Sequence, residues 1–293
     1  MANSIALFKK YIDLLDAVYK SASKSSVLDI DGKLVRAGAN ANEIIIPKIS
    51  MDGLADYSRN SGYISGDVTL TNETVKFNYD RGRKFTVDAM DNEESAGLAF
   101  GRLSSEFIRT KVVPEMDAVR FATYAGITGI GTTSATLENG NAVLSAILSA
   151  NNEMDEAEVP SDGRYLFITP TLHNLINAVD SYKSKAMLEK FSGIVDVPQS
   201  RFYTAIDLLD GVTKTDTEDE TAGGFKKNAD AKNINFMIIH KAAVIQFGKH
   251  TVNKIFTPEQ NQNSDGYIFC YRAYGLTDAY ENKAAGIYMH TAV

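Results

Sequence analysis

One continuous stretch, residues 68–126, most constrains what this chain can fold into. Polar and apolar side chains alternate through VTLTNETVKFNY (68–79), which predicts a strand, with a local bend at residues 72–73. Residues 80–83 (DRGR) predict a turn or bulge, and the strand resumes at 84–89, so the pattern predicts a hairpin that runs into a long helix. A compact enzyme rarely needs both elements at this length. The stretch is therefore typical of a structural protein that reaches its neighbours.

The helix is predicted to begin at Asp91 and to end at Gly126. Asp91 and Glu94 make a D-x-x-E capping box, and glycine commonly follows the last residue of a helix. About 34 residues at 1.5 Å each give a rod roughly 50 Å long. Pro114 removes one backbone hydrogen bond, so we expect a kink or break near residues 112–114.

Composition narrows the functional classes. The 293 residues are 44% hydrophobic, enough for one large domain or two ordinary ones with a substantial core. The 37 acidic and 30 basic residues give a net charge of −7, which argues against a nucleic-acid clamp but suits a wall that encloses DNA without binding it.

Cys270 is the single cysteine, so an intrachain disulfide and a cysteine-based zinc site are excluded, and we expect it to be buried. No apolar run approaches the ~20 residues of a membrane span.

The remaining segments are predicted as follows. Residues 4–20 carry one apolar stripe and predict an amphipathic helix, not a secretion signal. The polar run 21–26 after it leaves two alternatives, an arm on a flexible tether or a helix packed on its own domain. Residues 43–49 predict a strand that Pro47 keeps at a sheet edge. Further helices are predicted at 139–151 and 170–191, the second with a break after 179. Extended apolar segments are predicted at 164–168, 235–239, 243–247, 267–276 and 284–290, and the last two are expected to pair. Loops are predicted at 51–66 and 211–232.

No candidate catalytic, cofactor or metal site emerges. Residues 126–133 (GITGIGTT) come near a phosphate-binding loop, but Thr132 stands where lysine is needed and the segment follows a helix. The four histidines are scattered, and the acids at 216–220 lack the spacing of a calcium loop. No nucleophile, base and orienting group can be paired. We therefore predict a protein without an active site, cofactor or metal.

The order of elements resembles the major capsid protein of tailed bacteriophages, an α+β fold also used by encapsulin shells. The resemblance covers nearly the whole chain and includes capsid proteins of phages that infect Gram-positive bacteria. It is carried by FTVDAMDNEES (85–95), IRTKVVPEMDAVRFATYAG (108–126), YLFITPTLHNLINA (165–178) and FCYRAYGLTDAYENKAAGIYMH (269–290).

The resemblance implies five regions. They are an N-terminal arm (1–45), an extended E-loop hairpin (46–90), a P-domain spine helix (91–130), an A-domain (131–250) and closing P-domain strands (251–293). It also implies hexamers and pentamers of the same chain and a shell around double-stranded DNA in the virion. Assembly is expected in the bacterial cytoplasm with a portal, and either a separate scaffolding protein takes part or this sequence is a mature form. An encapsulin-like compartment shell, another phage structural protein and an α/β enzyme are the alternatives. Some members crosslink an E-loop lysine, but nothing identifies a partner for Lys76 or Lys84.

Charged residues at the two ends of the predicted hairpin are candidate intersubunit contacts. Complementary charges on neighbouring subunits can fix their register, so we expect a basic hairpin tip to lie near acids of the next subunit. The basic candidates are Arg81, Arg83 and Lys84, and the acidic candidates, where the hairpin meets the helix, are Asp88, Glu93 and Glu94.

Overall fold

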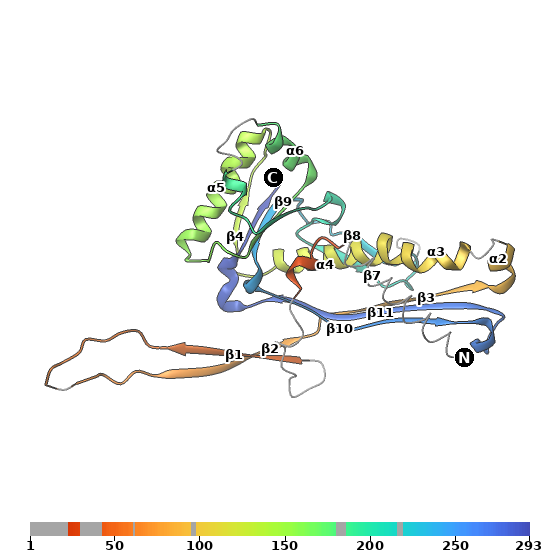
Figure 1. Ribbon diagram of the computed structural model, residues 1–293, viewed down its shortest axis with the longest axis horizontal. Helices are drawn as coiled ribbons and strands as arrows, with labels where there is room; N and C mark the ends of the chain where they lie inside the picture. The colour runs from red at the N-terminus through yellow and green to blue at the C-terminus, as the bar shows by residue number, and fades with distance from the viewer. Residues whose placement is uncertain (1–22, 30–42, 61, 95–97, 180–185, 216–218) are drawn as a thin grey trace.

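The computed structural model describes residues 23–29, 43–60, 62–94, 98–179, 186–215 and 219–293. These residues form an elongated molecule with three parts (Figure 1). Three long strands under a row of helices form a flat body, and a five-stranded sheet with two helices lies above one end of that body. A two-stranded hairpin projects beyond both. The predicted N-terminal helix (4–20) lies outside the described residues.

The projecting hairpin consists of β1 (Glu43–Met51) and β2 (Val68–Lys76). The strands pair antiparallel without interruption from Glu43↔Lys76 to Met51↔Val68, and the predicted loop joins them. β1 has one neighbour, so Pro47 lies in an edge strand as predicted. Asn72 belongs to the unbroken ladder, so the predicted bend at 72–73 is wrong.

The predicted turn at residues 80–83 is also wrong, because β3 (Tyr79–Asp88) runs straight through it. β3 pairs with β11 (Gly266–Ala279), which pairs with β10 (Val244–Phe256), and the three form the sheet of the flat body. A Cβ atom on Gly82 would lie 2.7 Å from the Tyr271 carbonyl oxygen. Glycine at 82 therefore allows two strands to approach closely, and the hairpin spans residues 43–76 rather than 46–90.

The long helix is present but segmented. It comprises α2 (Ala89–Glu94), α3 (Leu98–Phe107), a π-helical segment (Ile108–Val112) and α4 (Val113–Ala125). It begins earlier than predicted, since Asp88 accepts a hydrogen bond from the Met90 amide (2.9 Å) and Asp91 lies inside the first turn. Gly126 ends it as predicted. The wide π turn ends two residues before Pro114, which has no amide hydrogen to continue the ordinary ladder. The helix is therefore distorted near the position where the proline predicts a kink or break, but it continues directly into α4.

The second sheet has five strands in mixed orientation. In spatial order they are β4 (Gly131–Ser134), β12 (Ile287–Thr291), β9 (Ile234–His240), β5 (Arg164–Ile168) and β6 (Gly193–Asp196). α5 (Gly140–Glu156) and α6 (Pro170–Asn177) pack on one face through Val143, Ile147, Leu172 and Ile176. Asn139 caps α5 by accepting from the Ala142 amide at 2.9 Å. The predicted helix at 139–151 and the strand at 164–168 are thus confirmed. The helix predicted from 170 ends at Asn177, and residues 180–185 of its predicted continuation lie outside the described residues.

The other face of the five-stranded sheet packs on α4. Phe121 of α4 meets Phe167 of β5 and Phe202 edge-to-face, with ring centroids 5.2 and 4.9 Å apart. Leu28 is fully buried in the same cluster. A separate core lies between α4 and the flat sheet, where Val113 packs with Phe269. The helix is therefore the shared wall of both sheets.

Two predicted features of the C-terminal half are wrong. β12 pairs with β9 and β4 rather than with β11, and residues 211–232 contain β8 (Gly224–Lys227), which pairs with β7 (Ile206–Leu209). The C-terminal half of the chain therefore crosses twice between the sheets, through Lys241–Ala243 after β9 and through Glu281–Gly286 after β11. The crossings touch, since the Tyr280 amide donates to the Ala243 carbonyl at 3.0 Å.

Candidate intersubunit surfaces

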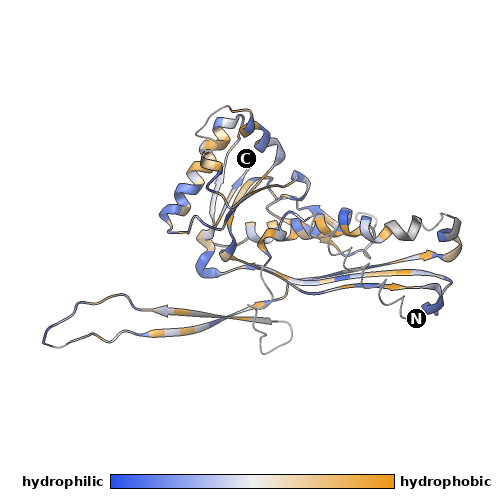
Figure 2. Ribbon diagram, in the orientation of Figure 1, coloured by the Kyte–Doolittle hydropathy of each residue, from blue (hydrophilic) through white to orange (hydrophobic). Residues whose placement is uncertain are grey.

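Large apolar side chains are exposed along the projecting hairpin. Hydrophobic positions recur along both strands in Figure 2. In the loop that joins the strands, Leu54 and Tyr63 are 108% and 90% exposed, as accessible as in an extended chain. The other exposed apolar residues of the hairpin are Ile49, Met51, Tyr57, Ile64, Val68 and Leu70. An exposed apolar patch of this kind marks a surface that another molecule covers.

The root of the hairpin is fixed to its own subunit. The Asn78 amide group bonds both backbone groups of Thr277, donating to the carbonyl at 2.7 Å and accepting from the amide at 3.1 Å. Phe77 stacks on Tyr274, with centroids 4.9 Å apart, and the Lys249 ammonium lies 4.7 Å from the Phe77 centroid. Lys249 is the extra residue of a bulge in β10 between Gly248 and His250. The hairpin therefore projects in a defined direction.

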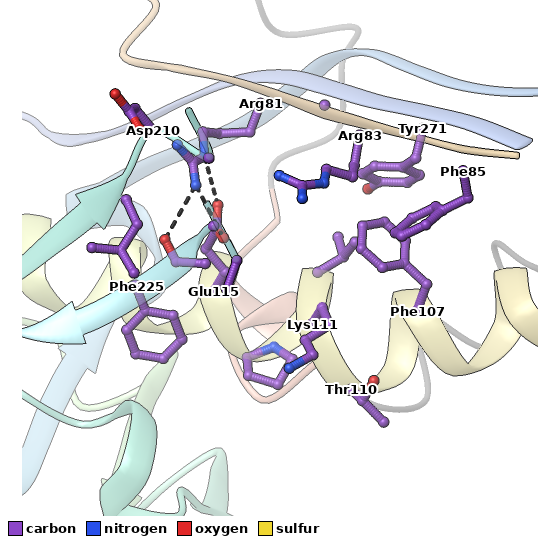
Figure 3. Close-up of a pocket in the computed structure, with 18 of the residues that line it drawn as sticks. Arg81, Arg83, Phe85, Phe107, Thr110, Lys111, Glu115, Asp210, Phe225 and Tyr271 are labelled. Atoms are coloured by element: carbon purple, nitrogen blue, oxygen red, sulfur yellow. Dashed lines mark hydrogen bonds and ion pairs between the residues drawn. The ribbon is translucent and has the colours of Figure 1, made fainter. Parts of the chain in front are cut away.

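A pocket of about 850 Å³ lies between β3, the long helix and the β7–β8 hairpin (Figure 3). Its aromatic wall includes Phe85 and Phe107, whose rings meet edge-to-face at 4.7 Å. Its charged lining includes Arg81, Arg83 and Glu115. Two of the predicted contact residues thus share one cavity.

Arg81 is tied to its own subunit. Its Nε donates to Glu115 Oε1 at 2.9 Å and its Nη2 donates to the Gly224 carbonyl at 3.2 Å. The Tyr79 hydroxyl donates to the same Glu115 oxygen at 3.2 Å. Burial, reinforced by the Glu115 charge, raises the pKa of Tyr79 well above its usual value. Tyr79 therefore stays a neutral donor, and the cluster joins β3, α4 and β8.

Arg83 rests on the loop of the β7–β8 hairpin. Its Nη2 donates to the Thr221 carbonyl at 3.0 Å. Gly211 and Gly223 have φ values of +77° and +65°, and a Cβ atom on Gly211 would lie 2.6 Å from Arg83 Nη1. Their lack of side chains makes room for the guanidinium group. Arg81 and Arg83 thus lie over the pocket and not at a hairpin tip, so the predicted basic tip is wrong.

The remaining candidates are more dispersed. Lys84 is exposed in β3 opposite Cys270, which is half-buried rather than buried as predicted. Asp88 is exposed, ends β3 and accepts a hydrogen bond from the first turn of α2. Glu93 and Glu94 belong to α2, but their side chains lie outside the described residues. Contacts of all six candidates with a second subunit stay predictions.

Three features of these surfaces were not predicted from the sequence. They are the apolar loop at the hairpin tip, the two hydrogen bonds between Asn78 and Thr277, and the contacts of Glu115 with Arg81 and Tyr79. The tip was detectable, because LADYSRNSGYI (54–64) contains Leu54, Tyr57, Tyr63 and Ile64 within a predicted loop. No local pattern marks Asn78 or Glu115, because both act on residues far away in the chain.

The described residues that were weighed for chemistry lie apart or in structural roles, whereas Asp216 and Glu218 of the acidic run lie outside the described residues. In the described part of the chain no three His, Cys, Asp or Glu side chains lie together as metal ligands, and no described helix is long and apolar enough to cross a membrane. The segment 126–133 leads into β4, where Thr133 Oγ1 and the Tyr288 hydroxyl are hydrogen-bonded at 2.6 Å. His290 is buried and stacks on Phe236, with centroids 5.0 Å apart.

No known family profile matches the chain, and no curated protein matches it. Solved structures do. The chain is similar to a structure described as the capsid of Staphylococcus phage Andhra (11% identity, 91% of this chain, 83% of that chain, TM-score 0.56) and to one from Gordonia phage Cozz (10% identity, 92% of this chain, 87% of that chain, TM-score 0.59). The chain has the tailed-phage capsid fold.

A third similar structure is that of a virus-like particle from Pyrococcus furiosus. It is 10% identical, covers 96% of this chain and 99% of that chain, and has a TM-score of 0.58. At these identities the likeness establishes the α+β capsid fold, which confirms the predicted fold class and the resemblance on which it rested.

Proposed function

We propose that this chain is the major capsid protein of a tailed bacteriophage and that its copies assemble into an icosahedral shell around double-stranded DNA. The observation that carries the proposal is the projecting hairpin, which exposes Leu54 and Tyr63 almost completely on a root fixed by Asn78. Covering apolar area with a second copy stabilises association by ~25 cal/mol per Å². A two-stranded ribbon, marginal alone, becomes ordered when it lies on a neighbour.

We assign the described elements to the regions that the fold implies. In this proposal β1 and β2 form the E-loop, and α2, α3, the π-helical segment and α4 form the spine helix. β3, β10 and β11 form the P-domain sheet, and the five-stranded sheet with α5 and α6 forms the A-domain. Residues before β1 form the N-terminal arm. Hexamers and pentamers of the chain make the shell, a separate scaffolding protein and a portal assist in the host cytoplasm, and the virion is the final location.

A structural role without catalytic turnover is part of the same proposal. The charged groups of the pocket are used in contacts within the subunit, as in the Arg81–Glu115 pair. The net charge of −7 limits adhesion of DNA to the wall, so the DNA is enclosed without sequence-specific binding.

A compartment shell is the second candidate, because the likeness to the Pyrococcus furiosus particle covers 96% of this chain. We prefer the phage shell because structures described as phage capsids recur among the similar folds, including those of Staphylococcus phage Andhra and Cyanophage P-SCSP1u. The contents of purified particles distinguish the two: packaged DNA supports the phage shell, and a protein cargo supports the compartment.

Electron microscopy of the purified full-length protein tests the proposal, alongside sedimentation over a range of concentrations. We expect closed shells, tubes or sheets. A matched variant with residues 52–67 replaced by a short Gly/Ser turn should fold normally and remain unassembled, because the replaced loop lies outside both sheets. A strictly monomeric natural sequence under all conditions, with scaffolding protein included, would contradict the proposal.

A further inference from the structure

The short segment 23–29 is held firmly against the long helix. The sequence allowed the polar run 21–26 to be a flexible tether, but Ser23 and Ser25 are buried. The segment forms a single 3₁₀ turn, Ser26–Leu28. Leu28, at the end of this turn, is fully buried in the core shared by α4 and the five-stranded sheet.

Asp117 of α4 is the centre of the contact. It is fully buried and accepts five hydrogen bonds. Its Oδ1 accepts from the Ser23 hydroxyl (2.9 Å), the Ser25 hydroxyl (2.6 Å) and the Ser25 amide (3.1 Å). Its Oδ2 accepts from the Lys24 amide and from Arg201 Nη1, both at 2.9 Å. One carboxylate therefore recognises the backbone and the serine side chains of the segment.

Two further side chains of the subunit body complete the site. Arg120 donates to the Ser25 hydroxyl at 2.8 Å and to Asp29 Oδ1 at 3.3 Å. Gln246 of β10 donates from Nε2 to the Ser25 carbonyl at 2.9 Å and to Asp29 Oδ1 at 2.6 Å. The Tyr124 hydroxyl donates to Gln246 Oε1 at 2.9 Å and holds that amide in place. The segment is bound by preorganised groups from α4 and β10.

The segment is nevertheless separable from the body. Its described backbone-to-backbone hydrogen bonds are internal, from Leu28 to Ser25 and from Asp29 to Ser26. The body holds it through side chains and through the packing of Leu28. The positive charge that balances Asp117 belongs to the body, because Arg201 stays beside it. After release Asp117 keeps its ion pair with Arg201. A carboxylate that stays paired in the protein costs much less free energy than a buried carboxylate without a partner.

We propose that the Asp117 site is a releasable latch that fixes residues 23–29, and with them the departure of the N-terminal arm, while the rest of the subunit stays folded. Residues 30–42 connect the latch to β1. The latch thus lies between the arm and the projecting hairpin along the chain. Its use during shell assembly rests on the proposed function, whereas its opening is a property of the single subunit.

Hydrogen exchange of the unassembled full-length protein, followed by mass spectrometry, tests the latch. The amides of Lys24 and Ser25 are protected by Asp117, so their exchange reports its opening. We expect Asp117→Asn and Ser25→Ala to accelerate exchange in peptides covering 23–29 about tenfold or more, the effect of losing a hydrogen bond to a charged group. Peptides of β5 and β9 should keep their natural exchange rates. Trypsin should also cut after Lys24 faster in both variants.

Two comparisons keep the test decisive. Glu106→Gln is the matched control, because Glu106 lies on the same helix in an exposed pair with Arg109 and should leave 23–29 unchanged. Ser23→Ala is the milder variant if Asp117→Asn fails to fold. Unchanged exchange in 23–29 would overturn the latch, and so would equal acceleration in 23–29 and β9. The assay requires no shells, so its failure is distinct from failure of the proposed function.

Discussion

Arg81 of β3 donates to the Glu115 carboxylate of α4 across 2.9 Å, so one ion pair joins the three-stranded sheet to the long helix. Arg81 and Arg83 are two residues apart in a strand and therefore extend from the same face, over the pocket of Figure 3. Reversing the charge at residue 81 would weaken the subunit itself. A double charge reversal of Arg81 and Arg83 would therefore report on the stability of the subunit as well as on assembly.

We predict that breaking this pair destabilises the isolated subunit. The side chains of Arg81 and Glu115 are only 24% and 11% exposed, so Arg81→Met should lower the free energy of unfolding by about 1–3 kcal/mol. Denaturant unfolding measures the change. Arg109→Met, which breaks the exposed pair with Glu106, is the control and should cost less than about 1 kcal/mol. Equal, small effects of both substitutions would show that the Arg81–Glu115 pair contributes no more to stability than the exposed pair.

Gly82→Ala should also destabilise the subunit. The new methyl group would lie 2.7 Å from the Tyr271 carbonyl oxygen, so β3 and β11 would have to separate. Overpacking of this kind costs about 1–3 kcal/mol, measured by thermal unfolding. Gly53→Ala is the control, because nothing lies within 4 Å of its Cβ position. If Gly82→Ala melts at the same temperature as the unsubstituted protein, the two strands can separate at this point without loss of stability.

The exposed tip of the hairpin should be dispensable for folding and required for assembly. The triple variant Leu54→Ser, Tyr63→Ser, Ile64→Ser removes apolar area that the subunit itself does not bury. The free energy of unfolding should change by less than about 0.5 kcal/mol per site, while particles disappear from sedimentation profiles. Val212→Ser, at a loop residue that is 79% exposed, is the matched control and should assemble normally. Particles in natural yield from the triple variant would assign assembly to another surface.

Asn78→Ala should loosen the hairpin root. The substitution removes two hydrogen bonds to the buried Thr277 backbone, worth about 0.5–1.5 kcal/mol each. We expect lower stability and faster hydrogen exchange within residues 68–76. Asn72→Ala, at an exposed position of β2, should change neither. If exchange in Asn78→Ala is unchanged, the contacts of Phe77 and Lys249 hold the hairpin in its orientation without Asn78.

His290 should make the subunit sensitive to mild acid. Burial lowers the pKa of His290 from its ordinary value of 6.5, and in the unfolded chain the ring titrates at that ordinary value. Between the two values the unfolded chain binds more protons. The contribution of neutral His290 to the free energy of unfolding is therefore complete above pH 6.5, and it is lost as the pH falls toward the pKa of the folded state. In melting curves at several pH values, His290→Gln should flatten this fall, whereas His240→Gln should keep it.

Local sequence patterns located most elements but not their partners. The cap at Asn139, the helix end at Gly126 and the helix distortion before Pro114 depend on residues within one or two turns, so their chemistry is visible in the sequence. Strand pairing depends on residues far apart: β11 and β12 follow each other along the chain, which predicts a pair, yet they belong to different sheets. Glycine at 82 satisfies a turn and a close strand contact equally well, and only the neighbour at Tyr271 distinguishes them.

The two touching crossings between the sheets restrict how the subunit can change shape. The segments Lys241–Ala243 and Glu281–Gly286 lie so close that a Cβ atom on Gly286 would be 2.6 Å from the Ala243 Cβ. α4 packs on both sheets as well, so a third contact joins the two parts of the subunit. We therefore expect the angle between the sheets to stay fixed within one subunit. A curved wall built from such subunits would set its radius at the contacts between subunits, while both sheets keep their internal packing.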